Sequence, residues 1–346
     1  MGKVLAIGML SGGLDSTLAT RVLLDQAIRI KGIHFNTGFC FIDHRRQIAR
    51  SNENPERLLN PVTRLSSLFD ISIDIIDIRE EYLEVLRHPK YGYGKNMNPC
   101  IDCRIMTMGK AKDFMEESGA DFVYSGEVLG QRPMTQHRRT LNLIEKRAGL
   151  EGRLLRPLSA KLLPETDLER KGLVDRNRLH NFSGRSRKPQ LALAYEYGLT
   201  DFPQPAGGCC FLTDPAYSRK LKDLFKYKNP DDCTLHDFLL LKVGRHLRVS
   251  PDLKVIVGRD EFENQYLDSI AGAMTRLEAI EVMGPVALAD GILTVENLRL
   301  TAEITARYSD GKDRPDLDVG IRSSGVESII TVKPQSPETV SQWVIS

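Results

Sequence analysis

The stretch Lys3-Val4-Leu5-Ala6-Ile7-Gly8-Met9-Leu10-Ser11-Gly12-Gly13-Leu14-Asp15-Ser16 decides the predicted fold. Residues 3–9 are mostly apolar and predict a buried strand, and residues 16–26 place apolar side chains at the spacing of one helix face. Residues 28–35 predict a second strand. Parallel strands need a crossover such as this helix between them. The sequence therefore predicts an α/β fold with a doubly wound parallel sheet.

The same alternation of strands and helices continues to about residue 200. Further helices are predicted at 55–69, 102–119 and 189–197, and further strands at 71–78, 121–125 and 154–158. Beyond an irregular stretch and a helical or mixed segment, short apolar runs predict strands at 253–257, 280–282, 292–295, 303–308 and 328–332. We therefore expect a first domain at 1–212, a connecting segment at 213–241 and a smaller β-rich domain at 242–346.

Composition and cysteine placement indicate a cytosolic globular protein. Of the 346 residues, 41% are hydrophobic and 27% charged, which is ordinary for globular chains. No apolar run approaches the ~20 residues that span a bilayer, and the apolar start runs into a glycine-rich turn rather than a cleavage site. The six cysteines are clustered, which is typical of a reducing compartment. We expect a cytoplasmic protein with no membrane partner.

The loop between the first strand and helix has the chemistry of a phosphate site. Gly12 and Gly13 let the backbone approach an anion, and the helix N-terminus presents unpaired N–H groups to it. Ser11 and Ser16 add hydroxyl donors, and Asp15 can orient the loop or help hold Mg²⁺. The alternative is a tight turn whose Ser and Asp residues only cap the helix.

No Gly-Lys-Ser/Thr follows the loop, so it is not a Walker A motif, and it lacks the G-x-G-x-x-G pattern. The run Ser11-Gly12-Gly13-Leu14-Asp15-Ser16 resembles the S-G-G-x-D-S signature of PP-loop ATP pyrophosphatases, which cleave ATP to AMP and pyrophosphate. The resemblance implies that ATP and Mg²⁺ are the cofactors. It implies a nucleotide site made of Ser11, Gly12, Gly13, Asp15, Ser16, His34 and Gly126.

Two cysteine groups are the candidates for sulfur or metal chemistry. Cys100 and Cys103 form a C-x-x-C at a predicted helix start, which favours thiolates, and Cys209 and Cys210 lie in a Gly-Cys-Cys-Phe segment. Three of these thiolates can hold a [4Fe–4S] cluster with one iron open to sulfide. Alternatively, one cysteine carries a persulfide and another resolves it by exchange, or the first pair forms half of a zinc site. Cys40 and Cys233 are interpreted as spectators.

Longer segments resemble the tRNA thiouridylases. Asn98-Pro99-Cys100-x-x-Cys103 and Cys209-Cys210-Phe211 are similar to motifs of the 2-thiouridine group. Ser125-Gly126-Glu127-Val128-Leu129-Gly130-Gln131 is similar to a motif of the 4-thiouridine group, and Leu154-Leu155-Arg156-Pro157-Leu158 to a segment of both. The resemblance spans about residues 3–212 and fits neither group fully. It implies an ATP-dependent sulfurtransferase that adenylates a uridine carbonyl of tRNA and replaces its oxygen with sulfur, with Asp15 and the four cysteines as catalytic residues.

A basic zone supports a nucleic-acid partner. Residues 132–188 hold fifteen Lys and Arg against six Asp and Glu, although the whole chain has a net charge of only +2. The candidate tRNA contacts are Arg132, Arg138, Arg139, Arg185, Arg187 and Lys188. The alternative is a solvated face of ion-paired arginines. Residues 242–259 resemble part of the RNA-associated module of NFACT proteins.

Several alternatives stay open at this point. The loop also fits an amide-forming PP-loop ligase that acts on a small metabolite, or an RNA-binding protein without catalysis. The sequence does not choose between sulfide and a persulfide carrier as sulfur donor, does not identify the thiolated uridine, and leaves open whether the chain forms a homodimer.

Overall fold

The computed structural model describes residues 4–41, 44, 61–199, 210–323 and 325–345. These residues divide into two compact units. The first contains residues 4–40 and 61–199, and the second contains 41, 44 and 210–345. Among the described helices, none has the length and apolar character that a membrane-spanning segment needs.

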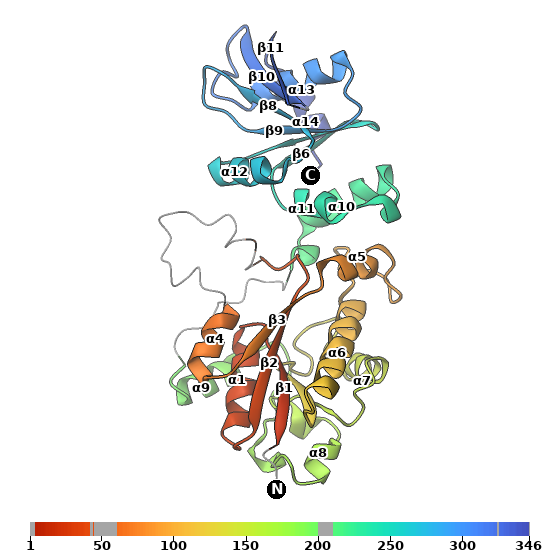
Figure 1. Ribbon diagram of the computed structural model, residues 1–346, viewed down its shortest axis with the longest axis vertical. Coiled ribbons are helices and arrows are strands. Elements are labelled where there is room, and N and C mark those ends of the chain that lie inside the picture. The colour runs from red at the N-terminus through yellow and green to blue at the C-terminus, as the bar shows by residue number, and fades with distance from the viewer. Residues whose placement is uncertain (1–3, 42–43, 45–60, 200–209, 324, 346) are drawn as a thin grey trace. The chain divides into compact units, whose positions relative to one another are not determined.

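In the described part of the first unit, five parallel strands form one sheet in the order β3-β2-β1-β4-β5 (Figure 1). The strands are β1 (Leu5–Met9), β2 (Arg29–Asn36), β3 (Ile73–Asp77), β4 (Phe122–Ser125) and β5 (Leu154–Leu155). The chain starts at β1, builds outward through β2 and β3, and returns to add β4 and β5 on the other side. This confirms the predicted doubly wound parallel sheet. It also creates a topological switch point between β1 and β4, where such sheets bind ligands at the carboxyl ends of the strands.

Helices cover both faces of this sheet. The helical segments of the unit are α1 (Leu14–Leu24), α4 (Pro61–Phe69), α5 (Arg79–Arg87), α6 (Cys100–Glu117), α7 (Arg138–Arg147), α8 (Asp167–Arg170) and α9 (Lys188–Glu196), with 3-10 turns η1 (Ala160–Leu162) and η2 (Arg176–Arg178). Figure 1 shows α1, α4 and α9 on one side of β1 and β2, and α6 and α7 on the other.

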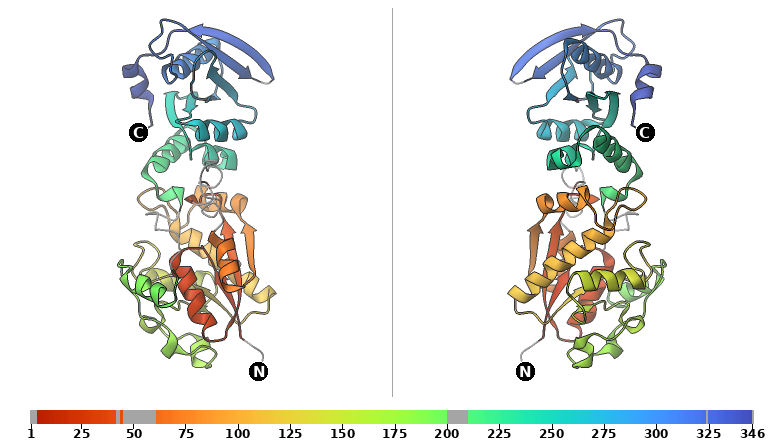
Figure 2. Two further views of the ribbon diagram at one scale, coloured as in Figure 1. Left: turned by 90° about the vertical axis from the view of Figure 1, so that its left-hand side faces the viewer. Right: turned by 90° about the vertical axis from the view of Figure 1, so that its right-hand side faces the viewer.

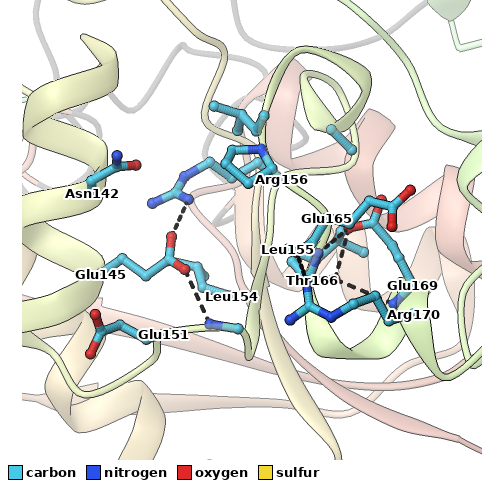
Figure 3. Close-up of a pocket in the computed structure, with 14 residues that line it drawn as sticks. Asn142, Glu145, Glu151, Leu154, Leu155, Arg156, Glu165, Thr166, Glu169 and Arg170 are labelled. Atoms are coloured by element: carbon cyan, nitrogen blue, oxygen red, sulfur yellow. Dashed lines mark hydrogen bonds and ion pairs between the residues drawn. The ribbon is translucent and has the colours of Figure 1, made fainter.

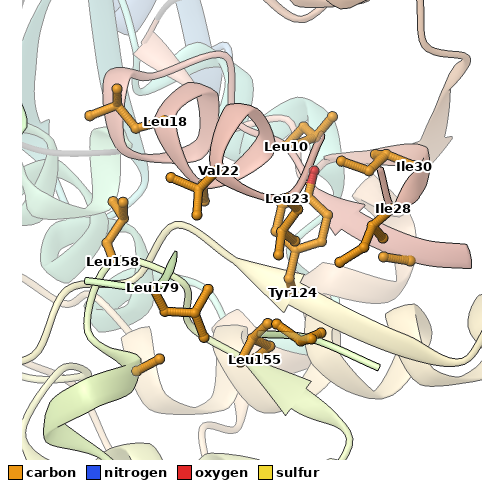
Figure 4. Packing of buried hydrophobic residues seen from close by; sticks show 14 of the residues in the cluster. Leu10, Leu18, Val22, Leu23, Ile28, Ile30, Tyr124, Leu155, Leu158 and Leu179 are labelled. Atoms are coloured by element: carbon orange, nitrogen blue, oxygen red, sulfur yellow. The ribbon is translucent and has the colours of Figure 1, made fainter. Parts of the chain in front are cut away.

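Strand periodicity divides the core between these two layers. Ala6 packs in the cluster that contains the α1 and α9 side chains, and its neighbour Ile7 packs in the cluster that contains the α6 and α7 side chains. Figure 4 shows Leu18, Val22 and Leu23 of α1 directed toward the sheet and its connections. Each such side chain contributes about 1.5–3 kcal/mol when fully buried. The position of the loop before α1 is therefore set by a packed helix.

The second unit contains an antiparallel sheet with the order β11-β10-β8-β9-β7-β6 among the described residues (Figure 2). Its strands are β6 (Arg245–Ser250), β7 (Leu253–Val257), β8 (Thr275–Ala279), β9 (Ala287–Gly291), β10 (Leu317–Ser323) and β11 (Val326–Val332). Its helical segments are η3 (Phe211–Thr213), α10 (Pro215–Tyr227), η4 (Pro230–Asp232), α11 (Leu235–Leu240), α12 (Glu261–Ile270), α13 (Val295–Arg307) and α14 (Pro337–Trp343). The predicted smaller β-rich part is thereby confirmed as a separate sheet.

Three of the predicted strands in this unit are wrong. Residues 303–307 lie in α13 and Tyr308 is its C-cap residue, and the first turn of the helix is capped by Thr294 through a hydrogen bond from the Asn297 N–H. The buried residues of α13 all lie between Thr301 and Ala306, three and four positions apart as on a helix face, and the apparent alternation of residues 303–308 hides this spacing. Residues 280–282 and 292–295 follow the ends of β8 and β9 and are not strands. The prediction also missed α5 and α7 in the first unit.

Candidate nucleotide and thiol site

The loop 11–13 lies at the carboxyl end of β1, beside the switch point. Gly12 has a φ of 71°, in the left-handed region that favours glycine. Gly13 is the N-cap residue of α1 in an extended conformation, and it offers no side chain to the N–H groups of the first turn. These N–H groups are the anion-binding feature of a helix N-terminus.

The two predicted serines lie together in this loop. The Ser16 hydroxyl donates to the Gly13 carbonyl at 2.8 Å and lies 3.3 Å from the Ser11 Oγ atom. The Gly13 N–H donates to Ser11 Oγ at 3.4 Å, a long hydrogen bond that a ligand can displace. Ser16 is buried and Ser11 is exposed. The loop therefore presents one hydroxyl to solvent and uses the other to hold its own backbone.

Asp15 is held by one oxygen only. Gln131, six residues past the end of β4, donates through Nε2 to Asp15 Oδ2 at 2.9 Å. The Oδ1 atom of Asp15 is buried without a hydrogen-bond partner among the described residues. A buried acceptor in this state costs about 1–3 kcal/mol, which a bound cation or donor removes. Asp15 therefore fits Mg²⁺, which binds carboxylate and phosphate oxygens.

Gly126 brings the end of β4 against the start of α1. A Cβ atom at Gly126 would lie 2.5 Å from the Ser16 backbone nitrogen and 2.6 Å from the Asp15 carbonyl carbon. Both are backbone atoms, so no side-chain rotation relieves the clash. Glycine is thus required here by packing against the loop.

His34 lies at the end of β2, next to the same loop. Its Nδ1 atom is 2.8 Å from the Leu10 carbonyl oxygen, and because a carbonyl only accepts, Nδ1 carries the proton. This hydrogen bond fixes the ring and leaves Nε2 to a ligand. The structure thus brings residues of β1, β2 and β4, separated by more than a hundred positions, to one edge of the sheet.

Cys100 and Cys103 occupy the first turn of α6 and are half-buried. The Asn98 side-chain amide donates to the Cys100 Sγ atom at 3.1 Å, which stabilises negative charge on the sulfur. Between the cysteines, Asp102 is buried and accepts two backbone N–H groups of the preceding loop, from Lys90 at 3.1 Å and Tyr91 at 3.0 Å. Asp102 therefore ties this loop to the thiol-bearing turn.

A buried carboxylate connects the thiol helix to the nucleotide loop. Glu127, which follows Gly126, has a side chain that is only 1% exposed. Arg104, which follows Cys103, lies 3.2 Å from Glu127 Oε1, and Arg156 donates to Glu127 Oε2 at 3.1 Å. Burial acts to raise the pKa of Glu127, but the two guanidinium groups outweigh it and hold that pKa below its usual value.

Arg156 also lines a cavity of about 310 Å³ that lies beside β5, between α7 and the segment of α8 (Figure 3). It donates to Glu145 Oε2 at 2.8 Å, and further carboxylates of the lining come from Glu151, Glu165 and Glu169. The segment 154–158 resembles a thiouridylase segment in sequence, which assigns it no role. In the structure its Arg156 forms ion pairs with Glu127 and Glu145.

The predicted metal ligands are only partly described. Cys100 and Cys103 belong to the first unit, Cys210 precedes η3 in the second unit, and Cys209 lies outside the described residues. In the described part of the chain, no three His, Cys, Asp or Glu residues are grouped so as to hold a metal ion. The described residues therefore do not present the three-cysteine set that a [4Fe–4S] cluster requires.

The six candidate tRNA contacts differ from four other arginines of their zone. Arg132, Arg138, Arg139, Arg185 and Lys188 are exposed and Arg187 is half-buried. Within the described residues, none of the six forms an ion pair, whereas the basic side chains paired with carboxylates nearby are Arg153, Arg156, Arg170 and Arg176. The paired arginines stabilise the fold, whereas the charges of the six candidates are not neutralised by a carboxylate among the described residues.

Comparisons with known proteins match both parts of the chain. Residues 3–145 match the family described as tRNA methyl transferase HUP domain, and residues 244–344 match the family described as NFACT protein RNA binding domain. The chain is 33% identical over 129 residues to the tRNA-specific 2-thiouridylase MnmA of Petrotoga mobilis, covering 35% of this chain and 34% of that protein. It is 29% identical over 137 residues to the enzyme of the same name from Sulfurimonas denitrificans, covering 37% and 36%.

The matched region spans only about a third of the length of these relatives. Among solved structures, a 4-thiouridine synthetase in complex with RNA and bound ATP is 20% identical with a TM-score of 0.34, covering 58% of this chain and 54% of that one.

Proposed function

Because the N-terminal part of this chain is a PP-loop domain of the tRNA thiouridylase type, and its C-terminal part an NFACT protein RNA binding domain, we propose that the protein is an ATP-dependent tRNA sulfurtransferase. It adenylates a uridine carbonyl and replaces the oxygen with sulfur. The observation that supports this proposal most strongly is that an ion pair and a close backbone contact connect the segment of the thiol pair to the loop 11–16.

This connection uses two pairs of residues that are adjacent in sequence. Cys103 is followed by Arg104, whose guanidinium binds Glu127, and Glu127 is preceded by Gly126, which packs on the backbone of Asp15 and Ser16. A thiol and an activated carbonyl must meet in one site for sulfur to replace oxygen. Positioning of this kind is the main catalytic contribution available to a protein in such a reaction.

The proposed reaction starts with ATP whose pyrophosphate binds the loop 11–16. Asp15 would hold Mg²⁺ through its Oδ1 atom, and the cation would neutralise part of the charge of the phosphates. The uridine carbonyl oxygen attacks the α-phosphorus, the bond to pyrophosphate breaks, and the base carries AMP as a leaving group. The first-turn N–H groups of α1 and the Ser11 hydroxyl stabilise the charge that develops on the phosphates.

Sulfur then displaces AMP from the base. In the persulfide form of the reaction, the terminal sulfur of a cysteine persulfide attacks the carbon, and AMP leaves with the original oxygen. A second cysteine thiolate then attacks the inner sulfur, so that the base keeps the thiocarbonyl and the two cysteines form a disulfide. A thiol reductant and a new sulfur donor restore the enzyme. The proposed participants are Cys100 and Cys103 together with Cys209 or Cys210.

The basic residues Arg132, Arg138, Arg139, Arg185, Arg187 and Lys188 serve as the tRNA contacts in this proposal. Their support is that they are left without ion pairs among the described residues, before and at the start of α9 and around α7. Phosphate contacts of this kind weaken steeply with salt.

The test is tRNA-dependent release of pyrophosphate by the full chain, measured together with sulfur incorporation into tRNA under anaerobic conditions. Asp15→Asn is expected to abolish both, whereas Cys100→Ser and Cys103→Ser are expected to abolish sulfur incorporation and retain pyrophosphate release. Pyrophosphate release that ignores tRNA and both cysteines would instead support an amide-forming ligase. Iron and sulfide analysis of the same preparation decides between a cluster and a persulfide.

A further inference from the structure

Two glutamine side chains form a chain of hydrogen bonds that ends at Asp15. Gln131 donates through Nε2 to Asp15 Oδ2 at 2.9 Å, and its Oε1 atom accepts from Gln190 Nε2 at 3.4 Å. Gln190 is in the first turns of α9 and is 0% exposed, although glutamine is mostly an exposed residue. Leu193 and Ala194 of the same helix are core residues, so an apolar side chain would fit the position of Gln190.

The orientation of the Gln131 amide follows from its contact with the Asp15 carboxylate. A carboxylate only accepts hydrogen bonds, so Gln131 has to direct its Nε2 toward Asp15 and its Oε1 away. The Oε1 atom then needs a donor, which Gln190 supplies. If Gln131 turned its amide over, its oxygen would face the Asp15 carboxylate and repel it.

We propose that Gln131 and Gln190 are positioning residues, which hold Asp15 by Oδ2 so that its unpaired Oδ1 is directed at the Mg²⁺ of bound ATP. The inference rests on the proposed function for the identity of the nucleotide. It explains two observations together, the buried glutamine of α9 and the Asp15 Oδ1 atom, which has no hydrogen-bond partner in the described part of the chain. It also adds α9, a helix outside the matched motifs, to the nucleotide site.

The first experiment uses Gln190→Leu, which removes the donor and preserves the packing volume. Binding of ATP to the full chain is measured as a function of Mg²⁺ concentration, together with thermal unfolding. We expect the Mg²⁺ concentration at half-saturation to rise about tenfold while the protein stays folded. Gln26→Leu is the matched control, because Gln26 accepts the Asp175 N–H at 2.8 Å at the far end of α1. Unchanged Mg²⁺ dependence in a folded Gln190→Leu variant would overturn the inference.

The second experiment uses Gln131→Glu, which is nearly isosteric and replaces the donor by an acceptor. At pH 8 two carboxylates then face each other, and turnover is expected to fall by about a hundredfold, the scale of a 1 Å misplacement. The Mg²⁺ concentration at half-saturation of ATP binding is expected to rise in the same variant. A purely structural role for Gln131 predicts that the Mg²⁺ dependence of ATP binding stays as in the unmodified chain, and that result would contradict the proposal.

These readouts separate the inference from the proposed function. If the unmodified chain binds ATP with Mg²⁺ but shows no tRNA-dependent turnover, the sulfurtransferase proposal fails. The Mg²⁺ dependence of ATP binding by Gln190→Leu still tests the positioning role in that case.

Discussion

Substitution of Gly126 by Ala tests whether the contact between β4 and the nucleotide loop determines activity. The new Cβ atom would lie 2.5 Å from the Ser16 nitrogen, whereas ordinary contact begins at 3.4 Å. The end of β4 and the start of α1 therefore have to separate by about 0.9 Å, the difference between these two distances. A displacement of about 1 Å at reacting groups lowers turnover by about a hundredfold, or about 2.7 kcal/mol in the barrier. Overpacking of this kind also destabilises by about 1–3 kcal/mol.

The assay is the initial rate of tRNA-dependent pyrophosphate release, with urea unfolding of the same preparations. Gly109→Ala is the matched control, since Gly109 lies within α6 and a Cβ there meets no described atom within 4 Å. That control should gain about 0.5–1 kcal/mol in stability and keep its activity. If Gly126→Ala retains the parental rate, the contact between β4 and the loop does not position the reacting groups and the reasoning is refuted.

Three further predictions follow from side chains around the site and in the second unit. Glu127→Gln should destabilise the first unit by about 3 kcal/mol at pH 7, because two arginines lose a buried carboxylate. The pKa of Glu127 in the folded chain lies below its usual 4.5. The stabilisation by Glu127 is therefore fully present above pH 4.5. The difference in unfolding free energy between Glu127→Gln and the unmodified chain, measured with urea, should shrink as the pH falls through the folded pKa. Arg138→Ala with Arg139→Ala should weaken tRNA binding and lower the slope of log affinity against log salt by up to about 2, whereas Arg153→Ala, whose side chain is paired with Glu116, should leave the slope unchanged. Burial, followed by the charge of Lys242, lowers the pKa of His44 from 6.5 to about 4. As the pH falls between these two values the unfolded chain takes up the proton first, so the free energy of unfolding should decrease. His44→Phe should remove this decrease from a plot of unfolding free energy against pH, and an unchanged plot would exclude His44 as its cause.

Local patterns predicted the parts of this protein that depend on neighbours in sequence. The apolar run before Ser11, the glycines after it and the helical spacing beyond it are sufficient for a strand, a turn and a helix, and the structure has β1, the loop and α1 at these positions. The same reasoning failed over residues 303–308, because alternation in six residues is compatible with both a strand and one face of α13. Short windows do not resolve the two periods.

Patterns in short sequence windows could not predict contacts between distant residues. Arg104, Glu127 and Arg156 are ordinary charged residues in sequence, and only the fold places them together in a buried network. No local pattern could predict a role for Gln190, because that role depends on its hydrogen bond to Gln131, which in turn donates to Asp15.

The sequence by itself determined that this chain has a glycine- and serine-rich loop between a buried strand and a helix, a pair of thiols at a helix start and a basic zone. These features depend on residue type and on spacings of a few positions, which the chain preserves in any fold. Only the tertiary structure decided that Gly126 touches Asp15 and Ser16, that Arg104 reaches Glu127, and that the buried Gln190 of α9 donates to Gln131. The physical reason is that strand order brings the ends of β1, β2 and β4 to one edge of the sheet, and this order arises from packing on both faces rather than from any local pattern.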